Sequence, residues 1–166
     1  MGKIYTALGL MSGTSMDGVD ASVIKSDGER VYSALFDRYF EYGDKIRQKI
    51  LDIRAKILVP DHLIKHESEI KDIEREITLF HSNVVKEILN NNKIDVDLLG
   101  FHGQTIYHDS KERISKQLGD GKFLSQLTKK KVVYDFRQND LENGGQGAPL
   151  TPIFHNLIAN KYLKEE

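Results

Sequence analysis

The fold is best predicted from one stretch near the start of the chain, Gly9-Leu10-Met11-Ser12-Gly13-Thr14-Ser15-Met16-Asp17-Gly18-Val19-Asp20. This stretch connects a short apolar segment, Ile4–Leu10, to an alternating one, Val19–Lys25, and both patterns predict β-strands. An Asp27-Gly28 turn signal then precedes a third predicted strand, Val31–Tyr39. The chain is therefore expected to open on a β-meander.

Downstream of the meander the hydrophobic period becomes helical. A first helix is predicted after a cap at Asp44, from isoleucines spaced by four, three and four residues: Ile46, Ile50, Ile53 and Ile57. Pro60 ends it, and Asp61 is the predicted cap of a longer helix that ends at the asparagines of positions 90–92. The apolar face of this helix is Leu63, Ile70, Ile73, Ile77, Phe80, Val84 and Ile88.

The second half of the chain alternates shorter elements. We expect a strand at Ile94–Phe101, a polar loop at Ser110–Gly121 and a short helix at Phe123–Thr128. A strand at Val132–Tyr134, a Gly-rich loop at Asp135–Ala148 and a helix at Thr151–Lys164, begun by Pro152, should follow. A meander followed by alternating strands and helices predicts an α/β fold, a mixed β-sheet with flanking helices. In such folds ligands bind where strand ends meet loops.

Composition excludes several classes of protein. The 166 residues suit one domain, or one lobe of a larger protein. With 24 basic and 25 acidic residues the chain is not a globally basic nucleic-acid binder. It has no cysteine, and therefore no disulfide, thiolate zinc site or cysteine nucleophile. Neither a membrane span nor a signal peptide is recognisable, so we expect no membrane partner and a cytoplasmic location.

The first candidate site is the segment from Met11 to Asp20, where two glycines, three hydroxyls and two carboxylates lie between predicted strands. Glycines let a backbone approach a ligand, hydroxyls donate to phosphate oxygens, and a carboxylate beside a polyphosphate commonly holds Mg²⁺. The alternative is an ordinary hairpin turn. The segment is neither a Walker A motif nor a nucleophile elbow, because the Gly-Lys-Ser/Thr and the strand–turn–helix context are missing.

The second candidate is His102-Gly103-Gln104-Thr105, whose side chains suit the hydroxyls of a polar ligand, although a lone histidine here is as often structural. His102, His108 and Asp109 have spacing that indicates a metal site only weakly.

The third candidate is Asp135-Phe136-Arg137-Gln138-Asn139-Asp140 with Gly144–Leu150. Its Arg offers a planar fork for a carboxylate or phosphate, and the glycines precede a helix N-terminus; a surface loop with local ion pairs is the alternative.

Together, in order and spacing, these stretches resemble the anhydro-N-acetylmuramic acid kinase family over essentially the whole chain. The resemblance implies an actin/sugar-kinase/Hsp70-type (ribonuclease H-like) lobe, with ATP and Mg²⁺ as cofactors and an anhydro-amino-sugar as substrate. It implies that ATP is bound by Gly13, Thr14, Ser15, Met16, Asp17, Gly18, Val19 and Asp20, with Mg²⁺ near Asp17. It implies that the sugar or phosphates are faced by His102, Gln104, Thr105, Asp135, Arg137 and Asp140.

The family opens the anhydro ring of 1,6-anhydro-N-acetylmuramic acid with water and phosphorylates the freed O6, a step of cell-wall sugar recycling. Its general-base aspartate lies in an Asp-Thr-Gly-Pro-Gly-Asn segment that does not occur in these 166 residues. The resemblance thus identifies residues 1–166 as the N-terminal lobe, without the C-terminal lobe. We expect either a kinase completed by a separate C-terminal half, or a truncated, non-catalytic remnant or sugar/phosphate-binding module. Exposed inter-lobe surface would favour self-association.

Overall fold

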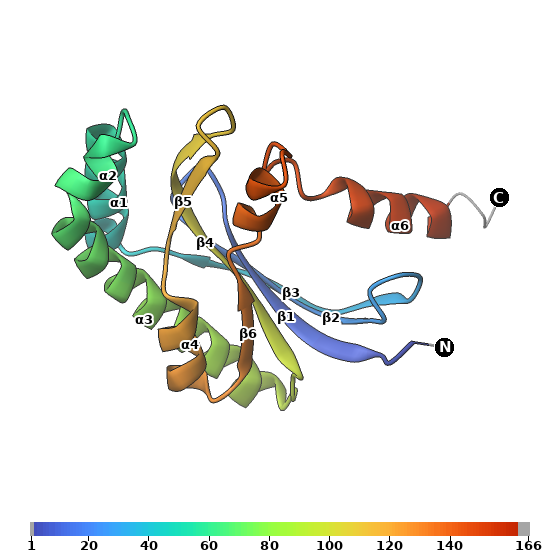
Figure 1. The fold of residues 1–166 in the computed structure, drawn as a ribbon. Helices are drawn as coiled ribbons and strands as arrows, with labels where there is room; N and C mark the ends of the chain where they lie inside the picture. Colours follow the sequence, from blue (N-terminus) through green and yellow to red (C-terminus); the bar gives the residue numbers. More distant parts are fainter. Residues whose placement is uncertain (1, 163–166) are drawn as a thin grey trace.

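The computed structural model describes residues 2–162, which form a mixed α/β fold (Figure 1). The strands are β1 (Tyr5–Ser12), β2 (Gly18–Ser26), β3 (Tyr32–Glu41), β4 (Leu98–Asp109), β5 (Ile114–Leu118) and β6 (Lys131–Tyr134). The helices are α1 (Asp44–Lys56), α2 (Asp61–Lys65), α3 (Glu67–Asn92), α4 (Gly121–Thr128), α5 (Gln138–Glu142) and α6 (Pro152–Tyr162).

The six strands form one sheet in the order β3-β2-β1-β4-β5, with β6 also paired to β4. The β1–β2, β2–β3 and β4–β5 pairs are antiparallel, whereas β4 runs parallel to both β1 and β6. The predicted meander and mixed sheet are therefore confirmed. The arrangement is consistent with the lobe that the family resemblance implies.

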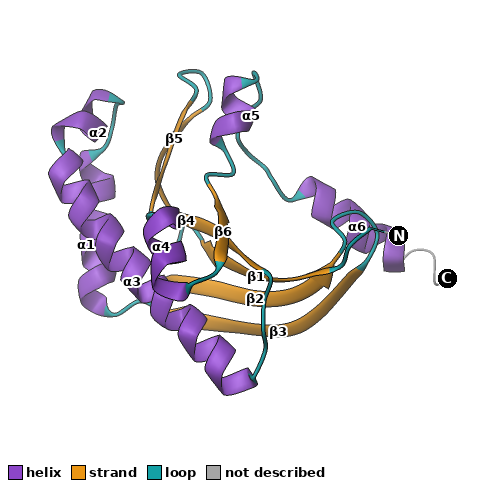
Figure 2. Cartoon of the chain, turned by 60° about the horizontal axis from the view of Figure 1, so that its bottom comes forward, coloured by secondary structure: helices purple, strands orange, loops and turns teal. Residues whose placement is uncertain are grey.

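The sheet has one covered face and one largely open face. Helices α1 to α4 gather on one side of the sheet, and α6 lies on the other side (Figures 1 and 2). Alternate strand residues pack against the helices, among them Leu8, Leu10 and Val23, together with Ile53 and Ile77 of α1 and α3. No helix within residues 2–162 is both long and apolar enough to cross a membrane.

Several expected boundaries were wrong. The predicted loop Ser110–Gly121 contains β5, whose sequence lacks an alternating apolar pattern and buries only Leu118. The predicted loop Asp135–Ala148 contains α5, a single short turn of helix. Helix α1 is capped by Gly43, with Asp44 as its first residue, where a carboxylate favours the positive end of the helix dipole.

The second expected helix was also wrong as one continuous element. It divides into α2 and α3 at His66, whose φ of −107° departs from helical geometry. The expected strand from Ile94 starts later, at Leu98, and continues to Asp109. The expected helix end at Lys164 lies outside the described residues.

A bulge in β4 determines which way its polar residues point. Between Leu10 and Ser12 the pairing of β1 advances by two residues, while β4 advances by three, from Phe101 to Gln104. The extra residue shifts the inward–outward alternation, as β-bulges do. Gly103 lies at this point with φ of +71°, and a Cβ there would collide with the carbonyl oxygen of Leu118. Glycine is the residue that meets both conditions.

Candidate functional site

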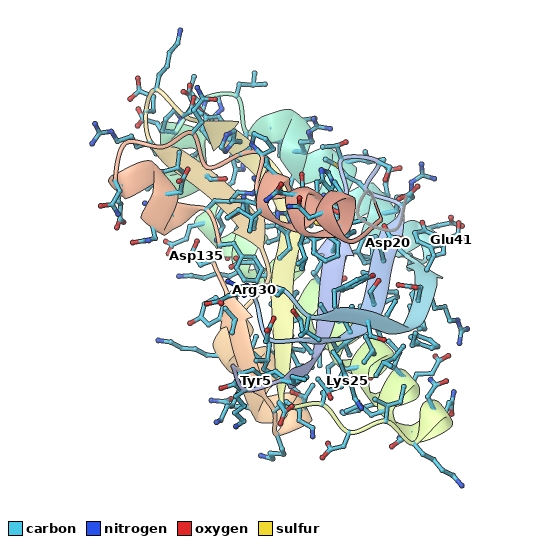
Figure 3. All side chains as sticks on the ribbon, turned by 90° about the vertical axis from the view of Figure 1, so that its right-hand side faces the viewer. Tyr5, Asp20, Lys25, Arg30, Glu41 and Asp135 are labelled. Carbon is cyan, nitrogen blue, oxygen red and sulfur yellow. The ribbon has the colours of Figure 1, made fainter. Side chains whose placement is uncertain are left out.

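The candidate residues gather at one end of the sheet. Strands β1 and β6, which both run parallel to β4, end there at Ser12 and Tyr134, and the β1–β2 hairpin turns there. Figure 3 labels Asp20 and Asp135 toward this end and Tyr5 toward the opposite one. This is the strand-end position at which α/β folds bind ligands.

The hairpin loop between β1 and β2 is anchored by its only buried residue, Met16, which is 1% exposed and has φ of 56°. The Met16 amide donates to the Gly13 carbonyl at 3.3 Å, and the Tyr42 amide donates to the Asp17 carbonyl at 2.8 Å. Gly18 follows, where a Cβ would lie 2.6 Å from the Tyr39 hydroxyl and would collide with the Phe40 carbonyl. The loop is therefore held in one conformation, with Thr14 and Ser15 exposed.

Asp17 is kept as a carboxylate. Ser15 Oγ donates to Asp17 Oδ1 at 2.5 Å, and this bond, with a weaker one from the Tyr39 hydroxyl and the charge of Arg47, lowers the pKa of Asp17. Tyr39, two residues from the end of β3, was not singled out from the sequence. The predicted meander implies that β3 pairs with β2, but it does not give the register of that pairing, and only the register brings Tyr39 close to Asp17.

His102 accepts hydrogen bonds from Arg137. His102 Nδ1 lies 2.7 Å from the Gly103 carbonyl and donates to it, so Nε2 is the acceptor for Arg137 Nε at 3.2 Å and Nη2 at 2.8 Å. Burial and the neighbouring guanidinium lower the pKa of His102, which keeps the ring neutral. The structure thus brings together two residues from the second and third candidate clusters.

Arg137 and Asp140 both bind Gly147 of the Gly-rich loop, Arg137 at its carbonyl and Asp140 at its amide. Arg137 Nη1 donates to the Gly147 carbonyl at 2.6 Å, and the Gly147 amide donates to Asp140 Oδ2 at 2.7 Å. The Gly145 amide donates to the Asp140 carbonyl at 2.8 Å, and a Cβ on Gly145 would collide with the Asp140 carboxylate. These contacts place the loop against β4. The predicted contacts of Arg137 and Asp140 with substrate stay predictions.

A polar hollow of about 290 Å³ opens beside this network. His102 and Asp135 line it, and Asp135 directly follows β6 with φ of 58°. The lining also includes an ion pair between Lys116 Nζ and Glu74 Oε1 at 2.6 Å, in which Glu74 is mostly buried. Neither Lys116 nor Glu74 was predicted, because β5 was expected to be a loop and Glu74 lies among the charges of a helix face.

Gln104 and Thr105 are not among the residues that line this hollow. Gln104 is fully buried opposite Ser12 and donates from Nε2 to the Gly13 carbonyl at 2.9 Å. Thr105 Oγ1 accepts from Gln117 Nε2 of β5 at 3.3 Å. Their predicted sugar contacts stay predictions.

The open face of the sheet carries a second, larger and mainly apolar hollow of about 720 Å³. Gly9 and Met11 of β1 form its floor, and Phe136, Leu150 and Phe154 form its walls. Met11 is 44% exposed and Phe154 38% exposed. A surface this apolar is unusual in a protein that works alone.

Within residues 2–162 no group of three or more histidine or acidic side chains is arranged to hold a metal ion. His108 Nδ1 contacts Ser115 Oγ at 3.0 Å, and nothing joins it to His102 in a ligand set.

Comparison with known proteins adds a family assignment. The sequence model of the anhydro-N-acetylmuramic acid kinase family matches residues 5–165. Relatives bearing that name include one from Pelagibacter ubique, 59% identical over 161 residues that cover 97% of this chain and 43% of the relative. Another, from Agrobacterium fabrum, is 43% identical over 166 residues, covering 96% of this chain and 43% of the relative. The chain thus spans less than half the length of the curated relatives it matches.

Proposed function

Because the chain belongs to the anhydro-N-acetylmuramic acid kinase family, we propose that it provides the N-terminal lobe of such a kinase. In the proposed reaction, water attacks the anomeric carbon of 1,6-anhydro-N-acetylmuramic acid and the anhydro bridge opens. The freed O6 then takes the γ-phosphate of ATP, and N-acetylmuramic acid 6-phosphate is formed. The observation that carries the proposal is the match of the family to residues 5–165, which include all three candidate clusters.

The geometry of the hairpin supports a role in holding the phosphates of ATP. Thr14 and Ser15 are exposed on a loop that Met16 anchors, so their hydroxyls and amides can reach an anion. The lowered pKa of Asp17 keeps a negative charge beside that loop, which suits Mg²⁺ bound through water or directly. When bound, Mg-ATP supplies the phosphoryl group and the charge neutralisation that phosphoryl transfer needs.

The polar hollow supports the sugar-binding half of the proposal. His102 lines it with a neutral ring held by Arg137, and Asp135 offers a carboxylate to sugar hydroxyls. The lactyl carboxylate of the substrate suits the ammonium group of Lys116, which also lines the hollow and is paired with Glu74. Catalysis in this scheme is chiefly positioning and charge stabilisation.

A C-terminal half is the second requirement. The Asp-Thr-Gly-Pro-Gly-Asn segment that the resemblance assigns to the general base does not occur in residues 1–166. We therefore propose that these 166 residues work together with a C-terminal lobe that supplies the general base, in the cytoplasm where ATP is available.

The test is complementation. The chain is co-expressed with the C-terminal part of the Pelagibacter ubique relative, and ATP-dependent formation of the sugar 6-phosphate is measured for the pair and for each part. We expect activity only in the pair. Asp17→Asn should lower it by about tenfold or more, as loss of a charge-assisted contact does. Asp52→Asn, an exposed control on α1, should leave it unchanged.

Two results would contradict the proposal. Turnover by the chain alone, abolished by Asp17→Ala, would mean that these residues contain a complete catalytic site. A well-folded pair with no turnover would favour the alternative, a non-catalytic remnant or a module that binds sugar or phosphate. Binding of Mg-ATP or anhydro-sugar to the inactive chain would then separate the remnant from the module.

A further inference from the structure

Gln104 differs from the other polar residues of its cluster because it is fully buried and lies under the hairpin. The bulge at Gly103 is what turns it inward, since Gln104 pairs with Ser12 and both side chains are buried. A regular strand of the same sequence, with no bulge, would direct position 104 to the opposite face. The bulge thus brings Gln104 Nε2 to the Gly13 carbonyl oxygen at 2.9 Å, the nearer of its two acceptors; the other is the Thr105 carbonyl at 3.5 Å.

The Gly13 carbonyl is held by two donors. Gln104 Nε2 lies 2.9 Å from it and the Met16 amide lies 3.3 Å from it. A peptide group is planar and trans, so its C=O and the following N–H point in opposite directions. Because the Gly13 carbonyl points toward the buried Gln104, the Thr14 N–H points away from the interior.

The side-chain oxygen of Gln104, Oε1, supports a specific role for the donor atom Nε2. Gln104 Oε1 is buried without a hydrogen-bond partner among the described residues. A buried unsatisfied acceptor is destabilising, and an apolar side chain would avoid it. What glutamine provides at this position, and an apolar residue does not, is the donor to Gly13.

We infer that Gln104 is a positioning residue for the hairpin: its Nε2 fixes the Gly13–Thr14 peptide so that the Thr14 amide faces a bound phosphate. The inference rests on the proposed phosphate role of the hairpin. It assigns Gln104 a function through Gly13 rather than through the sugar. Any triphosphate bound at the loop then meets an amide that is oriented before binding, which is how preorganised sites gain affinity.

The first experiment uses the ¹⁵N-labelled chain and two readouts, hydrogen exchange of the Thr14 and Ser15 amides and affinity for Mg²⁺-tripolyphosphate. Gln104→Met, a near-isosteric change that removes the donor, should accelerate exchange at these amides by about fivefold and weaken binding by about tenfold. Gln48→Met on the exposed face of α1 is the matched control and should change neither. Leu124→Ala, at a buried position of α4, reports the effect of general destabilisation.

A second variant tests the donor itself. In Gln104→Glu the introduced carboxyl can donate to Gly13 only while it is protonated, and burial favours that form. Hairpin protection should therefore be retained at low pH and lost as the pH rises and the carboxyl ionises. The unsubstituted chain and Gln104→Met should show no such step.

The outcomes are separable. Unchanged exchange at Thr14 and Ser15 in Gln104→Met, or exchange no faster than in Leu124→Ala at equal stability, overturns the positioning role whatever the ligand result. Failure of the unsubstituted chain to bind tripolyphosphate counts against the proposed phosphate site, and the exchange and pH data then decide the role of Gln104 by themselves. Equal tripolyphosphate affinity in the chain and in Gln104→Met also overturns the inference, while the proposed function stands.

Discussion

Acid should destabilise the chain through one buried histidine, His81 of α3. His81 is fully buried, with its ring centroid 4.9 Å from that of Phe101. Its Nδ1 lies 2.8 Å from the Ile77 carbonyl and donates to it, and Nε2 is buried without a partner among the described residues. Burial lowers the pKa of His81 to about 4. Protonation in the native state would therefore place an unsatisfied N–H in the core.

The direction and size of the effect follow from linkage. Between the ordinary pKa of 6.5 and about 4 the unfolded chain binds a proton at His81 and the native chain does not. Its contribution to stability is thus complete above pH 6.5 and is lost as the pH falls toward 4. The loss is about 1.4 kcal/mol per pH unit, and it accumulates to about 3 kcal/mol. That is a large share of the roughly 5–15 kcal/mol by which domains are stable.

The assay is urea unfolding followed by circular dichroism at several pH values from 7.5 to 4.5. His81→Leu removes the titrating ring. The free energy of unfolding of this variant should therefore fall less steeply, as the pH is lowered, than that of the unsubstituted chain. The lower pKa of His102 acts in the same direction in both proteins and cancels in the comparison. His155→Gln, at an exposed position of α6, is the control. Parallel pH profiles for the unsubstituted chain and His81→Leu would refute the reasoning.

Three further outcomes are expected. Gly18→Ala should lower the free energy of unfolding by about 2 kcal/mol or more, because the added Cβ would collide with β3. Gly43→Ala, where the added Cβ has open space around it, should change the free energy of unfolding by less than about 1 kcal/mol. Equal effects of the two substitutions in thermal unfolding would contradict this expectation. Asp140→Ala removes the acceptor of the Gly147 amide, so hydrogen exchange of that amide should accelerate about tenfold, and unchanged exchange would show that the loop is held by Arg137 alone. The apolar hollow on the open sheet face should cause concentration-dependent association in sedimentation velocity unless a C-terminal half is bound, and a monomer that binds no apolar dye would contradict it.

The elements with strong patterns were predictable from the sequence. The isoleucine spacing of α1 and the apolar face of α3 reflect burial against the sheet, and Ile50, Ile53 and Ile77 are indeed core residues. Strand β5 was missed because only Leu118 is buried in it. Its polar residues are held in the sheet by pairing with β4, and a single-sequence pattern carries no sign of that pairing.

The candidate site was predictable as a set of residues but not as a set of contacts. The motifs indicated His102, Arg137 and Asp140 individually, yet the hydrogen bonds from Arg137 to His102 and from the Gly147 amide to Asp140 depend on how β4 and the loop after α5 pack. The inward direction of Gln104 depends on the bulge at Gly103, and a glycine inside a strand suggests a bulge without revealing its phase. Tyr39 reaches Asp17 only through the register of β3 on β2.

The bulge in β4 also has a genetic consequence. His102 and Gln104 are two codons apart but belong to opposite layers of the molecule, His102 to the hollows and Gln104 to the interior. An in-frame deletion of the Gly103 codon would make them consecutive residues of a regular strand, whose side chains point to opposite faces, so both would keep their present sides. Loss of that one triplet should therefore disturb the strand less than a missense change of the same codon, because a Cβ at position 103 would collide with the Leu118 carbonyl.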